Sequence, residues 1–234
     1  MRSLVERIFM PSIAIKGMDT SSLRSLMMTL TASEISKMKY AQPSTEGVLP
    51  VFLERWSPRA FADRDVSAAD LKIVFEAARW APSSYNEQPW RFFVGHRGSE
   101  TFNKILDALV PSNQAWAKSA PVLILGVAKT RFSHNDTPNN YATHDLGAAM
   151  ALMAVQATAL GLAAHQMAGF DWVKARESFA IPETYAMGSV MALGYQGELA
   201  DLPEKFQAQE QSPRSRKALS EIVLEDWDRP ANLG

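Results

Sequence analysis

The sequence contains no cysteine in any of its 234 positions. Disulfide bonds, thiolate nucleophiles and cysteine-ligated zinc or iron–sulfur centres are therefore excluded as classes. The absence does not identify a compartment, because a chain without thiols is stable in both reducing and oxidising surroundings.

An excess of charge of one sign is also lacking. The 24 basic and 25 acidic side chains give a formal net charge of -1. A broad nucleic-acid surface requires a clear excess of Lys and Arg, so no nucleic-acid partner is expected. Any anion site must come from a few placed arginines.

The N-terminus lacks the apolar block and small-residue cleavage pattern of a secretory signal, so we expect a cytoplasmic protein. Residues 1–47 are expected to form a flexible or extended leader, with a linker-like end at 43–47, and residues 48–234 to form the compact domain. The leader is poor in acidic residues, which fits an organellar targeting segment. An extended or misassigned start is the simpler interpretation, since several internal methionines offer alternative starts.

No apolar run is convincing as a membrane span. The strongest candidate, residues 146–164, consists mostly of Ala, Gly, Leu and Met and contains Gln156 and Thr158. Ala and Gly contribute little transfer free energy, and neither a second span nor a basic flank accompanies the run. We interpret it as a buried helix and expect no membrane partner.

Hydrophobic residues make up 47% of the chain, enough for a sizeable core. Ser67 and Asp70 resemble a capping box, and the helix that follows should end before Pro82. The periodicities predict further helices at 99–109, 141–160 and 173–179 and strands at 91–94, 122–127 and 189–195, with a turn or short strand at 165–170. Because these elements do not alternate strictly, we predict an α+β fold with a mixed central sheet flanked by helices.

The predicted helix at 141–160 is apolar on every side. A helix without a polar face must be surrounded, either by its own domain or by a partner subunit.

Two clusters of arginine and serine stand near the two ends of the expected domain. Arg55, Ser57 and Arg59 form the first, and Arg214 and Arg216 flank a serine in the second. Arginine binds phosphate in a bidentate manner and serine adds a neutral donor, although each cluster alone is more typical of a solvated basic turn or tail. In a nearly neutral chain the two clusters could converge on one phosphate.

A third candidate is the polar loop at 81–90, between a predicted helix and a predicted strand. Its prolines bracket Ser83, Ser84, Asn86 and Gln88. Amide side chains offer donors and acceptors that suit the mixed edge of a heterocycle, whereas the alternative is an ordinary helix-to-strand loop.

Histidines and aspartates between residues 134 and 165 raise the question of a metal site. The spacings of His134, Asp136, His144, Asp145 and His165 match no recognised ligand pattern, so no metal is expected.

Taken together, these segments resemble the nitroreductase family of FMN flavoproteins, in the family's order and over nearly everything after residue 49. The matching segments are RWSPRAF at 55–61, APSSYNEQPWRFFV at 81–94, NQAWAKSAPVLI at 113–124, YATHDLGAAMALMAVQATALGLAAHQMAGFD at 141–171, GSVMALGY at 188–195 and PRSRKALSEIV at 213–223. The resemblance implies an intertwined homodimer with FMN bound between the subunits.

The resemblance also implies which residues contact FMN. Positions that match those holding the phosphate are Arg55, Ser57, Arg214 and Arg216. Positions that match those around the ring of the same subunit are Arg59 at the N1/O2 side, Asn113 at the polar edge, and Ala168 and Gly169, whose turn brings a backbone N–H toward N5. Positions that match those reaching the flavin from the other subunit are Pro82, Ser83 and Ser84, with Asn86 and Gln88 beside them.

The implied activity is electron transfer from NADH or NADPH to a small electron-poor acceptor such as a nitroaromatic, quinone or enone, by a ping-pong mechanism. A fixed cation near N1 favours the reduced flavin, so positioning and electrostatics do the catalysis and no side chain is assigned as a catalytic nucleophile. Alternatives are a flavin-binding protein without turnover, a dehalogenating or flavin-fragmenting relative, and an all-helical interaction protein. Some relatives carry a glutamate in place of Ala168 and a lysine in place of Trp116, and these two departures leave the donor and acceptor range open.

Overall fold

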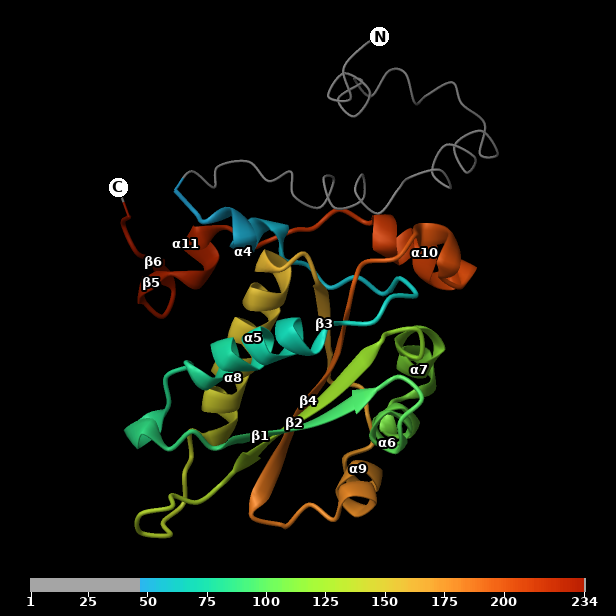
Figure 1. Ribbon diagram of the computed structural model, residues 1–234. Coiled ribbons are helices and arrows are strands. Elements are labelled where there is room, and N and C mark those ends of the chain that lie inside the picture. The colour runs from blue at the N-terminus through green and yellow to red at the C-terminus, as the bar shows by residue number, and fades with distance from the viewer. Residues whose placement is uncertain (1–46, 234) are drawn as a thin grey trace, which may run out of the picture.

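The computed structural model describes residues 47–233 of the chain, drawn in colour in Figure 1. The expected leader therefore lies outside the described residues, apart from Gly47, and remains a prediction. The described part begins with the short helix α4 (Pro50–Glu54), close to the predicted start of the domain.

A four-stranded sheet forms the centre of the fold, in the order β1-β2-β4-β3, and all three pairings are antiparallel. Its strands are β1 (Trp90–His96), β2 (Val122–Lys129), β3 (Ala163–Met167) and β4 (Tyr185–Gly194). The two inner strands, β2 and β4, correspond to the most continuous apolar runs in the sequence.

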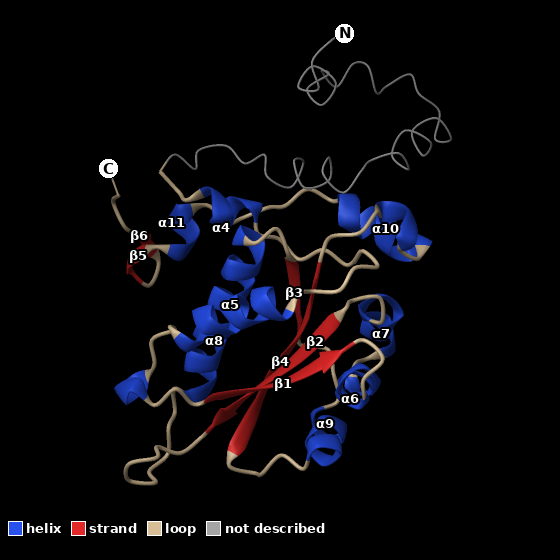
Figure 2. Ribbon diagram, viewed as in Figure 1, coloured by secondary structure: helices blue, strands red, loops and turns tan. Residues whose placement is uncertain are grey.

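Helices cover both faces of this sheet (Figure 2). On one face lie α5 (Ala68–Arg79) and α8 (Ala142–Ala159), and on the other lie α6 (Glu100–Ala108), α7 (Pro111–Ala117) and α9 (Trp172–Phe179). The predicted α+β class with flanking helices is confirmed, although the sheet of residues 47–233 is antiparallel where a mixed sheet was predicted.

Strand β2 shows why its sequence is apolar at every position. Leu123 and Leu125 point into the core beneath α6 and α7, whereas Val122 and Ile124 point into the core beneath α5 and α8. Because successive side chains of a strand point to opposite faces, a strand covered on both faces must be apolar throughout.

Serine side chains cap two helices, and the cap at Ser67 was predicted. The Ser67 Oγ accepts a hydrogen bond from the Asp70 N–H at 3.0 Å, and the Ser99 Oγ accepts one from the Phe102 N–H at 3.2 Å. Helix α5 ends at Arg79, before Pro82, as predicted.

Helix α8 buries one face against the sheet and α5 and presents the other to solvent in the single chain. The exposed face carries Gly147, Ala151 and Leu152 and no charge between them. Within residues 47–233, no helix combines the length and hydropathy that crossing a bilayer requires.

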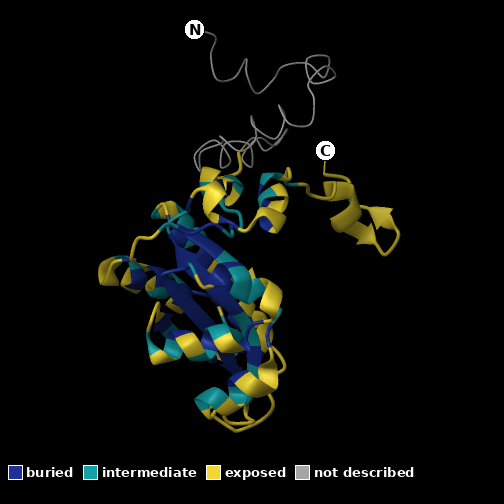
Figure 3. Cartoon of the chain, turned by 90° about the vertical axis from the view of Figure 1, so that its right-hand side faces the viewer, coloured by how far each residue is buried: buried dark blue, intermediate teal, exposed yellow. Residues whose placement is uncertain are grey.

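The C-terminal region contains short elements, most of which the periodicity did not reveal. They are η3 (Leu199–Asp201), α10 (Glu204–Gln211), α11 (Leu219–Ile222), β5 (Leu224–Asp226) and β6 (Arg229–Pro230). From α11 onward this arm stands apart from the buried core (Figure 3), and Trp227 at its hairpin is 83% exposed.

Candidate functional site

The two arginine clusters from opposite ends of the domain lie side by side. The Arg214 Nη1 donates a hydrogen bond to the Arg55 carbonyl at 2.7 Å, and its Nη2 donates to the Leu53 carbonyl. Burial and then the charge of Arg216 lower the pKa of Arg55, and burial followed by the charges of Arg216 and Arg55 lowers the pKa of Arg214. Arg55 and Arg214 are half-buried and Arg216 is exposed, with its charge acting on both, so a bound anion would relieve the repulsion among the three cations.

Arg59, the remaining arginine of the first cluster, is paired with a buried acid from helix α10. The Glu210 Oε1 accepts from the Arg59 N–H at 2.6 Å, and its Oε2 accepts from the Arg59 Nη1 at 3.4 Å. Glu210 is 2% exposed. This carboxylate ties the turn after Ser57 to the C-terminal part of the domain.

His165 supports the same turn from strand β3. Its Nδ1 lies 3.0 Å from the Pro58 carbonyl oxygen, and its ring centroid lies 4.5 Å from that of the buried Trp116. Burial, together with the charges of Arg59 and Arg55, lowers the pKa of His165 to about 4, although hydrogen bonds to the backbone at Pro58 and Ser57 oppose the shift. The ring is thus neutral near pH 7, with its proton on Nδ1, because only a donor can bond a carbonyl oxygen.

The turn after β3 is fixed by helix α7. The Asn113 Nδ2 donates to the Gly169 carbonyl at 3.1 Å, and the Val110 N–H donates to the same oxygen at 3.1 Å. A Cβ at position 169 would lie 2.9 Å from the Asn113 Nδ2 and 3.0 Å from the Val110 Cγ2, which explains the glycine. Two of the predicted site residues, Asn113 and Gly169, are thereby brought together.

The polar loop at 82–88 contains the short helix η2 (Ser84–Asn86) and is tied to the start of α8. The Ser84 N–H donates to the Asp145 Oδ2 at 2.9 Å, and the Gln88 N–H donates to the Ser83 Oγ at 3.0 Å. Asn86 and Gln88 have φ angles of +53° and +49°, a region that non-glycine residues rarely adopt. Strain of this kind gathers at functional loops.

The structure does not bring all predicted residues of the site into contact within one chain. Asp145, which holds the 82–88 loop, lies in the first turn of α8, whereas α4, next to Arg55, lies beside the other end of that helix (Figure 1). A helix of this length spans roughly 25 Å. One flavin could therefore contact both groups only if they came from different subunits.

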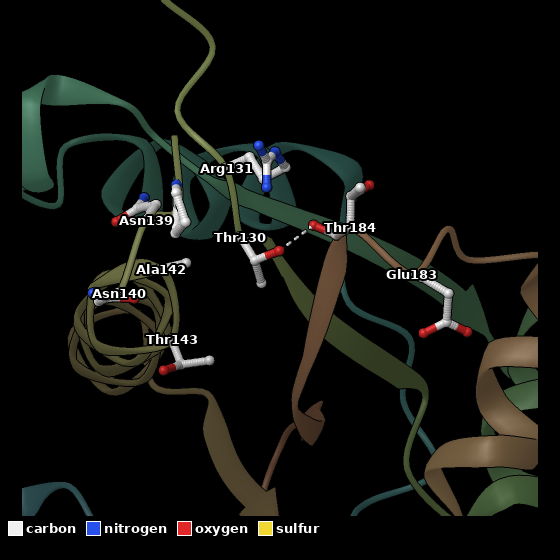
Figure 4. Close-up of a pocket in the computed structure, with 9 residues that line it drawn as sticks. Thr130, Arg131, Asn139, Asn140, Ala142, Thr143, Glu183 and Thr184 are labelled. Carbon is white, nitrogen blue, oxygen red and sulfur yellow. Dashed lines mark hydrogen bonds between the residues drawn. The ribbon is translucent and has the colours of Figure 1, made fainter. Parts of the chain in front are cut away.

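A cavity of about 520 Å³ that the sequence did not reveal lies at the start of α8 (Figure 4). Residues 130–131, 138–140, 142–143 and 183–184 line it, and the Thr130 hydroxyl donates to the Thr184 carbonyl at 2.9 Å. The Asn139 Nδ2 is buried and has no hydrogen-bond partner among the described residues.

Comparison with known proteins identifies the kind of protein to which these arrangements belong. The model of the nitroreductase family matches residues 53–195.

The chain belongs to the nitroreductase family.

Individual relatives agree with this membership. An uncharacterized 15.4 kDa protein of Mycolicibacterium smegmatis is 33% identical over 148 residues, which covers 60% of this chain and 99% of that protein. A protein of Archaeoglobus fulgidus that carries the provisional name NADH dehydrogenase/NAD(P)H nitroreductase is 30% identical over 163 residues, covering 68% and 91% of the two chains. The solved structure of an oxidoreductase containing FMN is 34% identical, with a TM-score of 0.76 and coverage of 81% of this chain and 97% of the other.

The structure shows the surroundings of Trp116 and Ala168, the two positions at which the resemblance implies a departure from some relatives of this nitroreductase-family chain. Trp116 is buried, with its ring centroid 6.4 Å from that of Phe61 and 4.5 Å from that of His165. The indole is therefore a packing residue beneath the arginine-bearing turn. Ala168 stands in the turn after β3, where its carbonyl accepts from the Phe170 N–H at 3.1 Å.

Two residues of this candidate site were not predicted from the sequence. Glu210 gave no signal, because α10 is polar along most of its length, and His165 was weighed only as a metal ligand. In the described part of the chain, no three His, Asp or Glu side chains are grouped closely enough to hold a metal ion.

Proposed function

We propose that this protein is an FMN-dependent oxidoreductase that passes electrons from NADH or NADPH to a small electron-poor acceptor, such as a nitroaromatic, quinone or enone, by a ping-pong mechanism. The observation that carries the proposal is the contact between half-buried Arg55 and Arg214 from opposite ends of the domain, with the charge of the exposed Arg216 acting on both. Family membership and the similar oxidoreductase that contains FMN support the choice of anion.

The chemistry of the donors fits a phosphate monoester. Arg55 and Arg216 supply guanidinium groups, Ser57 lies between Arg55 and Arg59 in the chain, and the Arg214 guanidinium braces the segment by donating to two carbonyls. Charge-assisted hydrogen bonds from arginine to phosphate are stronger than neutral ones and fix orientation. In this proposal these four residues hold the phosphate of FMN.

The ring would lie over the turns that His165 and Asn113 hold in place. Arg59 supplies positive charge on the N1/O2 side, and Asn113 and the backbone at Ala168 and Gly169 supply polar contacts. FMN, when bound, supplies the redox chemistry by accepting hydride from the nicotinamide and passing electrons to the acceptor. The residues of the chain orient the ring and favour negative charge at its N1/O2 edge, so none acts as a nucleophile.

A homodimer is part of the proposal. Pro82, Ser83 and Ser84, with Asn86 and Gln88 beside them, would complete the site of the partner, since they lie at the far end of α8 from Arg55. The exposed apolar face of α8 and the projecting C-terminal arm would be buried in such a dimer.

The decisive test is reconstitution followed by anaerobic reduction. The purified chain is mixed with FMN, freed of excess flavin and scanned; a colourless product would contradict the proposal. The yellow protein is then mixed in a stopped-flow instrument with NADH or NADPH, and afterwards with a panel of acceptors. We expect bleaching by at least one nicotinamide and recovery of colour with an acceptor. Failure of both nicotinamides to bleach it would instead indicate a binding protein without turnover.

A further inference from the structure

Helix α10 carries one buried carboxylate that the proposed function does not account for. Most of the helix is polar and faces solvent, but Phe206 and Glu210 are buried. Because these residues are four positions apart, they lie on the same face of the helix. Phe206 anchors α10 in the main core, so the position of Glu210 is fixed by packing.

Glu210 meets three donors from the arginine-bearing turn. The Arg59 N–H and the Ala60 N–H donate to its Oε1 at 2.6 and 3.4 Å, and the Arg59 Nη1 donates to its Oε2 at 3.4 Å. Burying a carboxylate without hydrogen-bond partners has a large desolvation cost, and these three hydrogen bonds offset that cost. One side chain therefore fixes both the backbone and the guanidinium of Arg59.

The charge of Glu210 has a second consequence. A carboxylate beside a guanidinium reduces the positive potential that the guanidinium exerts on its other neighbours. In a site that excludes water this reduction is larger than it would be in bulk solvent. Arg59 is itself only partly exposed, with 27% of its side chain open to solvent.

We infer that Glu210 is a positioning residue that holds Arg59 against the flavin. Its negative charge also keeps the reduction potential of the flavin lower than it would be beside an Arg59 that had no carboxylate partner. The inference rests on the proposed function, in which Arg59 lies on the N1/O2 side of FMN. Reduction places negative charge at that edge, so a stronger net cation there stabilises the reduced form. Removing the charge of Glu210 therefore raises the potential.

The test compares Glu210→Gln with Glu204→Gln, which removes the same charge from an exposed position of the same helix. Each protein is loaded with FMN and reduced slowly in the presence of a reference dye, and the potential is read at equilibrium. We expect Glu210→Gln to bind reduced FMN about tenfold more tightly relative to oxidised FMN, a shift of about +30 mV for a two-electron couple. Glu204→Gln should match the unaltered protein.

Equal potentials in Glu210→Gln and Glu204→Gln, with FMN bound to both, would overturn the inference and leave the proposed function standing. Failure of the unaltered protein to bind FMN would overturn both together. If near-ultraviolet circular dichroism shows that Glu210→Gln is not folded, Glu210→Asp decides. Glu210→Asp keeps the negative charge but places it farther from the Arg59 guanidinium. A reduction potential above that of Glu204→Gln supports the inference, and an equal potential overturns it.

Discussion

Arg216 offers the sharpest single-residue test of the phosphate site. Its side chain is exposed, and its charge lowers the pKa values of both Arg55 and Arg214. We predict that Arg216→Gln weakens FMN binding roughly 10- to 100-fold, the loss expected for one hydrogen bond to a charged group. Fluorescence titration of the apoprotein with FMN measures the change. Arg229→Gln is the control, because Arg229 lies in the C-terminal hairpin, where its Nε is 3.6 Å from the Glu225 Oε2. Equal affinities of the two variants would contradict the site.

The lowered pKa of His165 predicts that the free energy of unfolding depends on pH. Its pKa in the folded protein is about 4, below the value of about 6.5 in an unfolded chain. Between pH 6.5 and pH 4 the unfolded chain takes up a proton that the folded protein refuses, so the free energy of unfolding falls across this window. The total loss is about 3 kcal/mol, and above pH 6.5 it is absent.

Urea denaturation of the apoprotein at a series of pH values measures this effect. We expect His165→Gln to flatten the curve between pH 6.5 and pH 4 relative to the unaltered protein. His96→Gln, at an exposed position at the end of β1, should keep the full slope. Parallel curves for all three proteins would show that His165 is protonated as easily in the folded state as in the unfolded one.

The residues of the candidate site differ in how visible they are in the sequence. Arg55 and Arg216 could be proposed as neighbours because the chain has almost no net charge, so paired arginine clusters stand out. Glu210 could not, since an acid within a polar helix looks like any solvated side chain until the fold shows what lies beside it. The role of His165 was likewise invisible, because the Pro58 carbonyl that it bonds is 107 positions away.

At the scale of elements, the contribution of a helix cap to stability can be measured. The Ser99 Oγ caps helix α6 by accepting from the Phe102 N–H. We predict that Ser99→Ala lowers the free energy of unfolding by about 1 kcal/mol, whereas Ser99→Asp, which keeps an acceptor at the N-cap, changes it by only a few tenths. Urea denaturation compares the two. Equal destabilisation by alanine and aspartate would mean that the hydroxyl acts by packing and not as a cap.

Elements with a strong periodic pattern were predictable and those without one were not. Strand β2 and helices α5, α6 and α8 each carry apolar residues at the spacing of their structure, and their observed positions agree with prediction to within a few residues. In the region of strand β3 the sequence predicted only a turn or short strand, because His165 and Gln166 interrupt the apolar pattern. Helix α10 was missed because only two of its residues face the core.

At the scale of the whole molecule, the two groups of predicted flavin contacts lie at opposite ends of α8. The sequence indicated which residues to group together, since their order matches the family, but only the fold shows that one chain holds them apart. The same helix presents an uncharged face of small and apolar residues to solvent. A second subunit packed on that face would account for both facts.

Ala151 lies on this exposed face of α8 and tests the dimer directly. We predict that Ala151→Arg converts the protein to a monomer, because burying an unpaired guanidinium in an apolar interface is unfavourable by several kcal/mol. Arginine is a good helix former, so the helix itself should survive. Size-exclusion chromatography with light scattering reports the mass. The control is Ala69→Arg, at an exposed position in the first turn of α5, which should stay dimeric.

The FMN affinity of the Ala151→Arg monomer then connects assembly to the site. If Pro82, Ser83 and Ser84 reach the flavin from the partner, the monomer loses their contacts while keeping Arg55, Arg214 and Arg216. FMN binding should therefore weaken but not vanish, since the phosphate contacts come from one chain. A monomer that binds FMN as tightly as the dimer would show that each subunit has a complete site, and the 82–88 loop would then need another explanation for its strained backbone.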